Sequence, residues 1–393
     1  MSDGALAQLV ALSEQETTQE ESLALDLALA DALACMASAM YRGLARSRLT
    51  SVEDLVITHS VLDLDDVDWA TVHHPGSVVI PAALAAGLDR GCSGSQLISA
   101  LSIGYRVSSG VAAMLDPDMR TRWHATAICG AFGAGAAAAL LREPDRDVLY
   151  RTLALVASSV GGLAAAPRAR NGAAVFTRVA AASLGVLAAR GARKGLPIAP
   201  GIVSGPGGLA EILSQTPARS IGNVRGVDMV SLRLFPVTGF AHAAVWTASA
   251  IPEQYDAVHR LEVSLSEAAA LMNGDGSWWN VAQAVGRAFA ERDPFACDRP
   301  TDPPCDVHVR GAHLPIDRAT IVVDTVDGSR VEFSSDVPGR LNDELTRELF
   351  NRKAHDVLAV SGPEALSNSV ALLSDGVAAG EGILRWMPKS ISL

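Results

Sequence analysis

The stretch GAFGAGAAAALL at residues 130–141 decides the fold class of this chain. Each of its three glycines costs up to about 1 kcal/mol of helix propensity relative to alanine, the best helix former. We expect close approach between helices to compensate for that cost, because glycine lets two backbones come together. The stretch therefore predicts one helix, over residues 126–141, in a core of closely packed helices.

The sequence on both sides extends this pattern. Clusters of Gly, Pro and Asp separate further predicted helices at residues 22–46, 81–89, 95–114, 148–166 and 177–194. After about residue 227 the pattern changes. LEVSLS (261–266) predicts a strand, and ATIVVDTVDGSRVEFSS (319–335) predicts a hairpin that turns at Asp327 and Gly328. The remaining predicted helices cover residues 278–291, 342–360 and 363–374.

These patterns predict a mainly α fold in two parts. Residues 1–228 and 341–393 would form a large all-helical domain. Residues 229–340 would form a smaller inserted α+β domain, or lid. Aromatic residues make up only 5% of the chain against 49% hydrophobic residues, which favours a core of small side chains over a sheet sandwich.

Composition excludes several function classes. The 43 acidic and 32 basic residues give a net charge of −11, which argues against nucleic acid as a partner. Five cysteines without a CxxC pair indicate neither a disulfide framework nor a zinc site. The N-terminus lacks a basic flank before an apolar run, and the apolar runs are expected to be core helices, not membrane spans. We therefore expect a cytoplasmic protein.

Four carboxylates and three histidines lie within HSVLDLDDVDWATVHHPGSVVIP, residues 59–81. His74 precedes Pro75, whose ring favours an extended backbone at the histidine, so the imidazole can project from a loop. An unperturbed imidazole pKa near 6.5 suits proton transfer at neutral pH. His124 stands at the entrance to the helix of residues 126–141. We predict that His74 and His124 share a pocket, with Asp63 beside them.

Three other interpretations apply to the same residues. The acidic cluster can be a solvated loop that caps the next helix. DLDD also matches the DxDD pattern of class II terpene cyclases, but those need an aromatic-lined cavity, and the chain has only 18 Phe, Tyr and Trp residues. A divalent metal site would need a second acidic motif on another helix, so we expect no metal.

Several motifs in order resemble the MmgE/PrpD family, which includes 2-methylcitrate dehydratase and cis-aconitate decarboxylase. They are residues 59–81, GYRV, WHATAICGAFGAGAAAALL, IVSGPGG and LRLFPVTGFAHAA. The resemblance covers most of the chain. It implies a cofactor-free, metal-independent lyase or isomerase with a helical domain, an α+β lid and a homodimeric state. It also implies catalytic roles for Asp63, His74 and His124.

The chain departs from the family pattern at other positions. Val67 replaces a threonine or serine, and arginines stand where the family has lysines. Arginine keeps the positive charge but does not release a proton at accessible pH. A decarboxylase histidine aligns with Thr238 and a lid tyrosine with Asn280, whereas a later histidine is kept as His242. The substrate-binding residues that the resemblance and the neighbouring sequence imply are Arg170, Arg233, Thr238, His242, Asn280 and Trp279.

Three hypotheses follow. The first is proton transfer by His74 and His124 at a carbon next to a carboxylate or carbonyl of a small-molecule substrate, in a dehydration or decarboxylation. The second is a biosynthetic isomerase, epimerase or cyclase acting on a bulkier, less charged metabolite, with Trp278 and Trp279 as an apolar wall. The third is a dimeric binding protein without catalytic activity.

Overall fold

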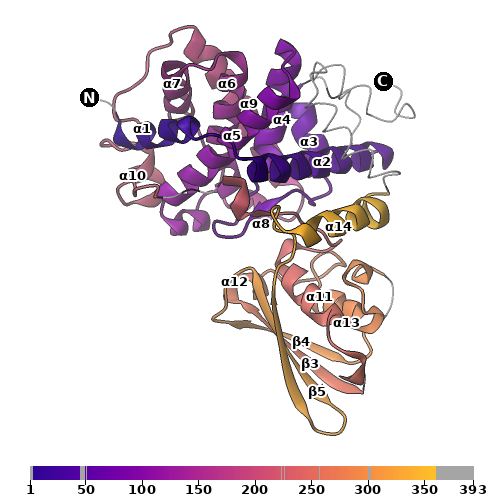
Figure 1. Ribbon diagram of the computed structural model, residues 1–393. Helices are drawn as coiled ribbons and strands as arrows, with labels where there is room; N and C mark the ends of the chain where they lie inside the picture. The colour runs from indigo at the N-terminus through magenta and orange to yellow at the C-terminus, as the bar shows by residue number, and fades with distance from the viewer. Residues whose placement is uncertain are drawn as a thin grey trace. The chain divides into compact units, whose positions relative to one another are not determined.

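The computed structural model describes residues 3–44, 49, 51–222, 224, 226–255, 257–299 and 302–359. These residues divide into two compact units on either side of the bond between Val230 and Ser231. The first unit is mainly helical, and the second combines helices with a sheet (Figure 1). The prediction of a mainly α fold is therefore confirmed.

The first unit is built around helix α6 (Ala125–Arg142), which contacts α4, α5, α7 and α9. The other elements of this unit are α1 (Gly4–Ala11), η1 (Leu12–Glu14), α2 (Gln19–Tyr41), α3 (Val52–Ser60), β1 (Val67–Asp68), α4 (Gly76–Arg90), α5 (Gly94–Met114), η2 (Pro117–Thr121), α7 (Arg146–Ala157), α8 (Ala165–Arg168), α9 (Ala173–Arg193), α10 (Leu209–Ser214) and η3 (Gly226–Met229).

The glycines of α6 allow the close packing that the sequence predicts. A Cβ atom at Gly133 would lie 2.5 Å from the carbonyl oxygen of Gly104 in α5. A Cβ at Gly185 in α9 would lie 2.6 Å from the backbone nitrogen of Gly135. Both obstacles are backbone atoms, which cannot rotate away as a side chain can. The core of this unit therefore depends on glycine at two helix crossings.

Among the described residues, four helices are long and apolar enough to cross a membrane: α2, α5, α6 and α9. In α2 and α6, 83% of the most apolar window is buried within the structure, and in α5 78%. Their apolar side chains are therefore used for packing inside this unit. In α9 the buried share is only 44%, and Phe176 and Leu187 are exposed.

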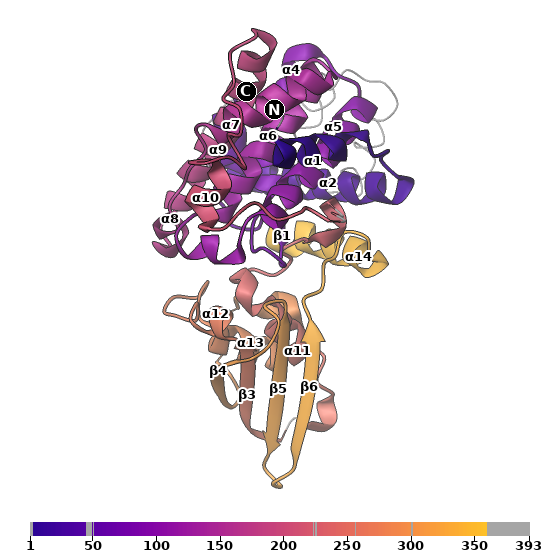
Figure 2. The same cartoon turned by 90° about the vertical axis from the view of Figure 1, so that its left-hand side faces the viewer.

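The second unit contains a four-stranded sheet in the order β4, β3, β5, β6 (Figure 2). Strand β3 (Val258–Ser266) pairs in parallel with β4 (Asp306–Ala312) and antiparallel with β5 (Arg318–Thr325), which pairs antiparallel with β6 (Arg330–Asp336). The remaining elements are β2 (Val230–Ser231), which begins at the boundary, η4 (Gly239–Ala241), α11 (His242–Ser249), η5 (Glu253–Tyr255), α12 (Glu267–Ala270), α13 (Val281–Glu291), η6 (Pro294–Ala296), α14 (Glu344–Arg352) and the π-helical turn η7 (Lys353–Val357).

The predicted hairpin is confirmed as β5 and β6. Ile321 lies opposite Phe333, and the turn uses Gly328 at φ +86°. The Asp327 carboxylate accepts a hydrogen bond from the N–H of Ser329 at 3.0 Å, which closes the turn. Helix α11 contacts β5 and β6, and α13 contacts β4.

Some predicted boundaries were wrong. The helix predicted at residues 148–166 ends at Ala157, and Gly162 adopts a φ of +134°, which a helix cannot accommodate. Helix α4 begins at Gly76 and contains Pro81, so the proline does not start the helix. The residues 341–359 were assigned to the all-helical domain, but α14 and η7 belong to the second unit. The predicted helix at 363–374 lies outside the described residues.

Candidate functional site

The loop between α3 and α4 places two acidic side chains against a buried arginine. Asp65 is fully buried, and its carboxylate lies 3.1 Å from Nη1 of Arg178 in α9. Asp63 is partly exposed, and one carboxylate oxygen lies 4.0 Å from Nη2 of the same arginine. The backbone of Asp63 is left-handed at φ +53°, a conformation rare for residues with a side chain. Arg178 therefore ties this loop to α9.

His74 is held by the same loop. Its Nδ1 lies 2.7 Å from the backbone oxygen of Asp66 and 3.5 Å from a carboxylate oxygen of Asp65. A carbonyl oxygen can only accept, so Nδ1 carries the hydrogen and neutral His74 has its lone pair on Nε2. The backbone N–H of His74 donates to the hydroxyl of Thr126, two residues after His124. The loop is thereby attached to the start of α6.

His124 precedes α6 directly and is buried. Its Nδ1 lies 2.6 Å from the hydroxyl of Thr177, the residue before Arg178 in α9. Burial, followed by the nearby charge of Arg178 and by His74, lowers the pKa of His124 to about 3, against an opposing effect of Asp65. His124 is therefore a neutral ring at physiological pH.

Asp66 lies on the other side of this loop. Its carboxylate accepts hydrogen bonds from the hydroxyl of Tyr105 at 2.7 Å and from the N–H of Gly76 at 2.9 Å. Burial, with a smaller contribution from the charges of Asp65 and Asp31, raises the pKa of Asp66 to about 7, although both hydrogen bonds oppose the shift. A Cβ atom at Gly76 would lie 2.6 Å from that carboxylate, so only glycine fits there.

His73 has a structural role in the same loop. Its ring is fully buried between the hydroxyls of Thr71 at 2.5 Å and Ser108 at 3.1 Å. Its backbone forms a bridge with Asp68. Burial lowers the pKa of His73, so it stays neutral. Both ring nitrogens are engaged in hydrogen bonds that fix the loop.

The predicted residues after 231 lie in the second unit. Arg233 and His242 are buried there, and Nε2 of His242 donates to the carbonyl oxygens of Phe235 at 3.2 Å and Val237 at 3.3 Å. Burial, then the charge of Arg233, lowers the pKa of His242 to about 3. The ring of Phe235 lies 5.0 Å from that of His242. His242 is thus a neutral residue in an aromatic environment.

The other predicted substrate residues have local structural contacts. Asn280 caps α13, because its side-chain oxygen accepts the N–H of Gln283 at 3.0 Å. Thr238 is buried, and its N–H donates to the carbonyl of Trp278. Trp279 is partly exposed. Arg170 is exposed and left-handed at φ +51°, just after α8.

Sequence reasoning missed several buried cations, among them Arg178 and Lys353. Arg178 contacts both acids of the loop, yet it stands in the apolar repeat VFTRVAAAS, where a single arginine resembles a surface residue. Lys353 is fully buried in η7, and its charge lowers the pKa of His242. A charged residue at a core position of an amphipathic helix was the available signal in both cases.

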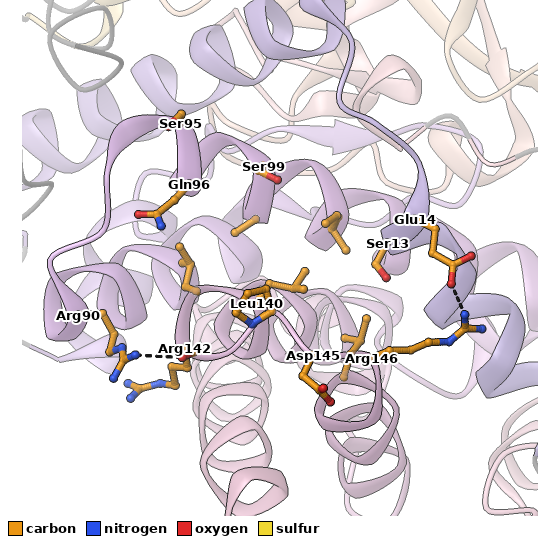
Figure 3. A pocket seen from close by; sticks show the side chains of 15 residues that line it. Ser13, Glu14, Arg90, Ser95, Gln96, Ser99, Leu140, Arg142, Asp145 and Arg146 are labelled. Atoms are coloured by element: carbon orange, nitrogen blue, oxygen red, sulfur yellow. Dashed lines mark hydrogen bonds and ion pairs between the residues drawn. The ribbon is translucent and has the colours of Figure 1, made fainter. Parts of the chain in front are cut away.

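A cavity of about 650 Å³ lies elsewhere in the first unit (Figure 3). Figure 3 shows Arg90 and Arg142 near one end and Arg146, paired with Glu14, near the other. Arg142 is paired with Asp89 at 2.6 Å. The described residues that line this cavity include no histidine, and none of the predicted site residues is among them. Across the described residues, no group of three or more His, Cys, Asp or Glu could hold a metal ion.

The sequence of the first unit is similar to a known protein family. Residues 54–221 match the family model described as the MmgE/PrpD N-terminal domain. The matched range contains the loop of Asp63 and His74, as well as His124 and Arg178. No curated protein matches the chain at a significant level.

Proposed function

Since the chain belongs to the MmgE/PrpD family, we propose that it is a lyase or isomerase that transfers a proton at a carbon next to a carboxylate or carbonyl. Members of this family are generally enzymes, dehydratases among them. The substrate would be a small molecule, handled without a cofactor, and the second unit would act as a lid. The enzyme would be a homodimer in the cytoplasm.

One observation carries the proposal: a histidine with a defined lone pair stands beside a buried carboxylate. The Nδ1–H of His74 donates to the Asp66 carbonyl, and the Asp65 carboxylate lies 3.5 Å away. When Nε2 takes up a proton, the new positive charge is stabilised by Asp65. A neutral imidazole oriented in this way is suited to act as a general base.

Hydrogen–deuterium exchange tests the proposal. The protein would be incubated in D2O with a panel of di- and tricarboxylates and hydroxy acids, and deuterium entering C–H positions would be followed by NMR. Exchange at a carbon next to a carboxylate is expected for at least one compound, because dehydration, decarboxylation and isomerisation share the proton-transfer step.

The variant His74→Asn is the matched test, since the asparagine amide can keep the hydrogen bond to Asp66 but lacks Nε2. It should lose exchange by at least about 100-fold, the usual contribution of general acid–base catalysis. His308, exposed on β4, provides the control, and His308→Asn should exchange normally. Equal exchange by His74→Asn and the unchanged protein would contradict the proposal.

The second hypothesis, a bulkier and less charged substrate, is favoured by Asn280. Its side-chain oxygen is used to cap α13, so the position offers a helix cap where the family pattern has a tyrosine. If no carboxylate in the panel binds or exchanges, neutral hydroxy ketones and lactones form the next panel. Exchange by those compounds alone, lost in His74→Asn, would support an isomerase, epimerase or cyclase.

A further inference from the structure

The hydrogen bonds of Thr177 fix which nitrogen of His124 carries a hydrogen. The hydroxyl oxygen of Thr177 lies 2.8 Å from the carbonyl oxygen of Ala174 and 2.6 Å from Nδ1 of His124. A carbonyl oxygen can only accept, so the single hydroxyl hydrogen is donated to Ala174. Thr177 must then accept from His124, which places the hydrogen on Nδ1 and the lone pair on Nε2.

Charges around His124 keep that ring neutral. Arg178 from α9 and His74 from the loop both disfavour a positive charge on it, and Asp65 is the one acidic group among these neighbours that favours it. Asp65, however, pairs with the guanidinium of Arg178 at 3.1 Å, and its effect on His124 is smaller than those of burial, Arg178 and His74. The ring is also buried, which adds to the cost of protonation.

The surroundings of His74 favour a positive charge on its ring, unlike those of His124, although the two rings have the same tautomer. The Nδ1–H donates to the carbonyl of Asp66, so its Nε2 also carries the lone pair. The carboxylate of Asp65 lies 3.5 Å from Nδ1 of His74, so its negative charge stabilises the positive charge of a protonated His74 ring. The side chain is also less buried than that of His124.

We propose that Thr177 and Arg178, consecutive residues of α9, make the two histidines unequal: His124 remains neutral and only accepts hydrogen bonds through Nε2, whereas His74 takes up and returns the proton. This inference rests on the proposed function and deepens it. Thr177 and Arg178 are positioning residues, because they act through the histidines.

The inequality specifies a substrate class. A group that hydrogen-bonds to Nε2 of neutral His124 must be a donor, and a substrate hydroxyl near the carbon that loses its proton meets this requirement. His74 takes that proton through Nε2, and the electron pair of the broken C–H bond moves onto the adjacent carbonyl or carboxylate. In a dehydration, the C–O bond then breaks, a C=C bond forms, and the proton on His74 leaves with the hydroxyl as water. Hydroxy acids and hydroxy carbonyl compounds fit this scheme.

The test is ¹⁵N NMR of the full chain with ¹⁵N-labelled histidine, in which two-bond proton–nitrogen correlations identify the tautomer of each ring. His124 is assigned as the signal lost in His124→Asn. We expect an Nδ1–H ring that does not titrate between pH 5 and 8. Thr177→Val removes the acceptor of Nδ1–H and should shift His124 toward the Nε2–H tautomer, whereas Thr177→Ser should preserve Nδ1–H.

Arg178→Gln should raise the pKa of His124 by about one unit or more, the usual effect of removing a nearby like charge and freeing an opposite one. Arg178→Lys keeps the positive charge and should change the pKa of His124 less. If Arg178→Gln does not fold, Thr177→Val and Thr177→Ser still test whether Thr177 sets the tautomer of His124. An Nε2–H tautomer in the unchanged protein, titration of His124 between pH 5 and 8, or an unaltered tautomer in Thr177→Val would each overturn the inference.

These spectra need no substrate. Inactivity toward every carboxylate would therefore count against the proposed function and leave the tautomers as they are. Conversely, exchange activity that depends on His74, found together with an Nε2–H tautomer at His124, would keep the proposed function and refute the inequality.

Discussion

Replacing Asp66 by asparagine should remove a large part of the pH dependence of stability. The Asp66 carboxyl is fully buried between Tyr105 and Gly76, with a pKa raised from 3.8 to about 7. Between these two values the unfolded chain has released the proton of Asp66, but the folded protein still holds it. Unfolding then releases a proton, so the free energy of unfolding falls as pH rises through this window.

The magnitude follows from the difference between the two pKa values. About 3 units at 1.36 kcal/mol each give a total loss of about 4 kcal/mol, most of it between pH 4 and pH 7, and the change levels off at about pH 8. Asparagine does not titrate, and its amide can still accept from the N–H of Gly76 and donate to the hydroxyl of Tyr105. The stability of Asp66→Asn relative to the unchanged protein should therefore rise by about 2 kcal/mol from pH 5 to pH 7.

Urea unfolding of both proteins at pH 5, 6, 7 and 8 measures this difference. The contributions of the other titrating groups are the same in both proteins, so they cancel in the difference. Asp118 in η2 is exposed, and Asp118→Asn provides the control, whose difference from the unchanged protein should stay constant. The reasoning is refuted if the difference for Asp66→Asn varies by less than about 0.5 kcal/mol over the same range.

Two further predictions concern the first unit. Gly133→Ala should lower the free energy of unfolding by about 1–3 kcal/mol, because its Cβ would lie 2.5 Å from the carbonyl oxygen of Gly104. Gly4→Ala, at the open start of α1, is the control and should not destabilise the protein. Thermal unfolding of the two variants measures the difference. Glu21→Gln should lower the free energy of unfolding by about 3–5 kcal/mol in urea unfolding, because Glu21 is the buried partner of Arg106. A loss below about 1 kcal/mol would show that the backbone carbonyls of Gln15 and Glu16, which also accept from Arg106, suffice for this arginine.

The helical core and the hairpin were predictable because their signals are local. Glycine among alanines at 130–141 predicted close helix packing, and the structure places the backbones of Gly133 and Gly104 in contact. The Asp327–Gly328 turn predicted the β5–β6 hairpin. The end of α7 at Ala157 was missed, because helix propensity outweighed the two glycines that follow.

The candidate site was only partly predictable. The His-Pro pair and the acidic run identified the loop that carries Asp63 and His74, and the start of α6 identified His124. Asp65 was not among the predicted catalytic residues, yet it pairs with Arg178 and lies beside His74. Arg178 was not considered at all, because nothing within its own helix shows that it faces an acid.

The sequence by itself determined the mainly α fold, the two histidines at loop and helix boundaries, and the family resemblance. All of these depend on residues close together in the chain or on their order. Only the tertiary structure decided which charges meet: Asp65 and Arg178 are 113 residues apart, and His124 and Thr177 are 53 apart. Such contacts arise when α9 packs against α6 and α3, and no local pattern specifies which side chains then face each other.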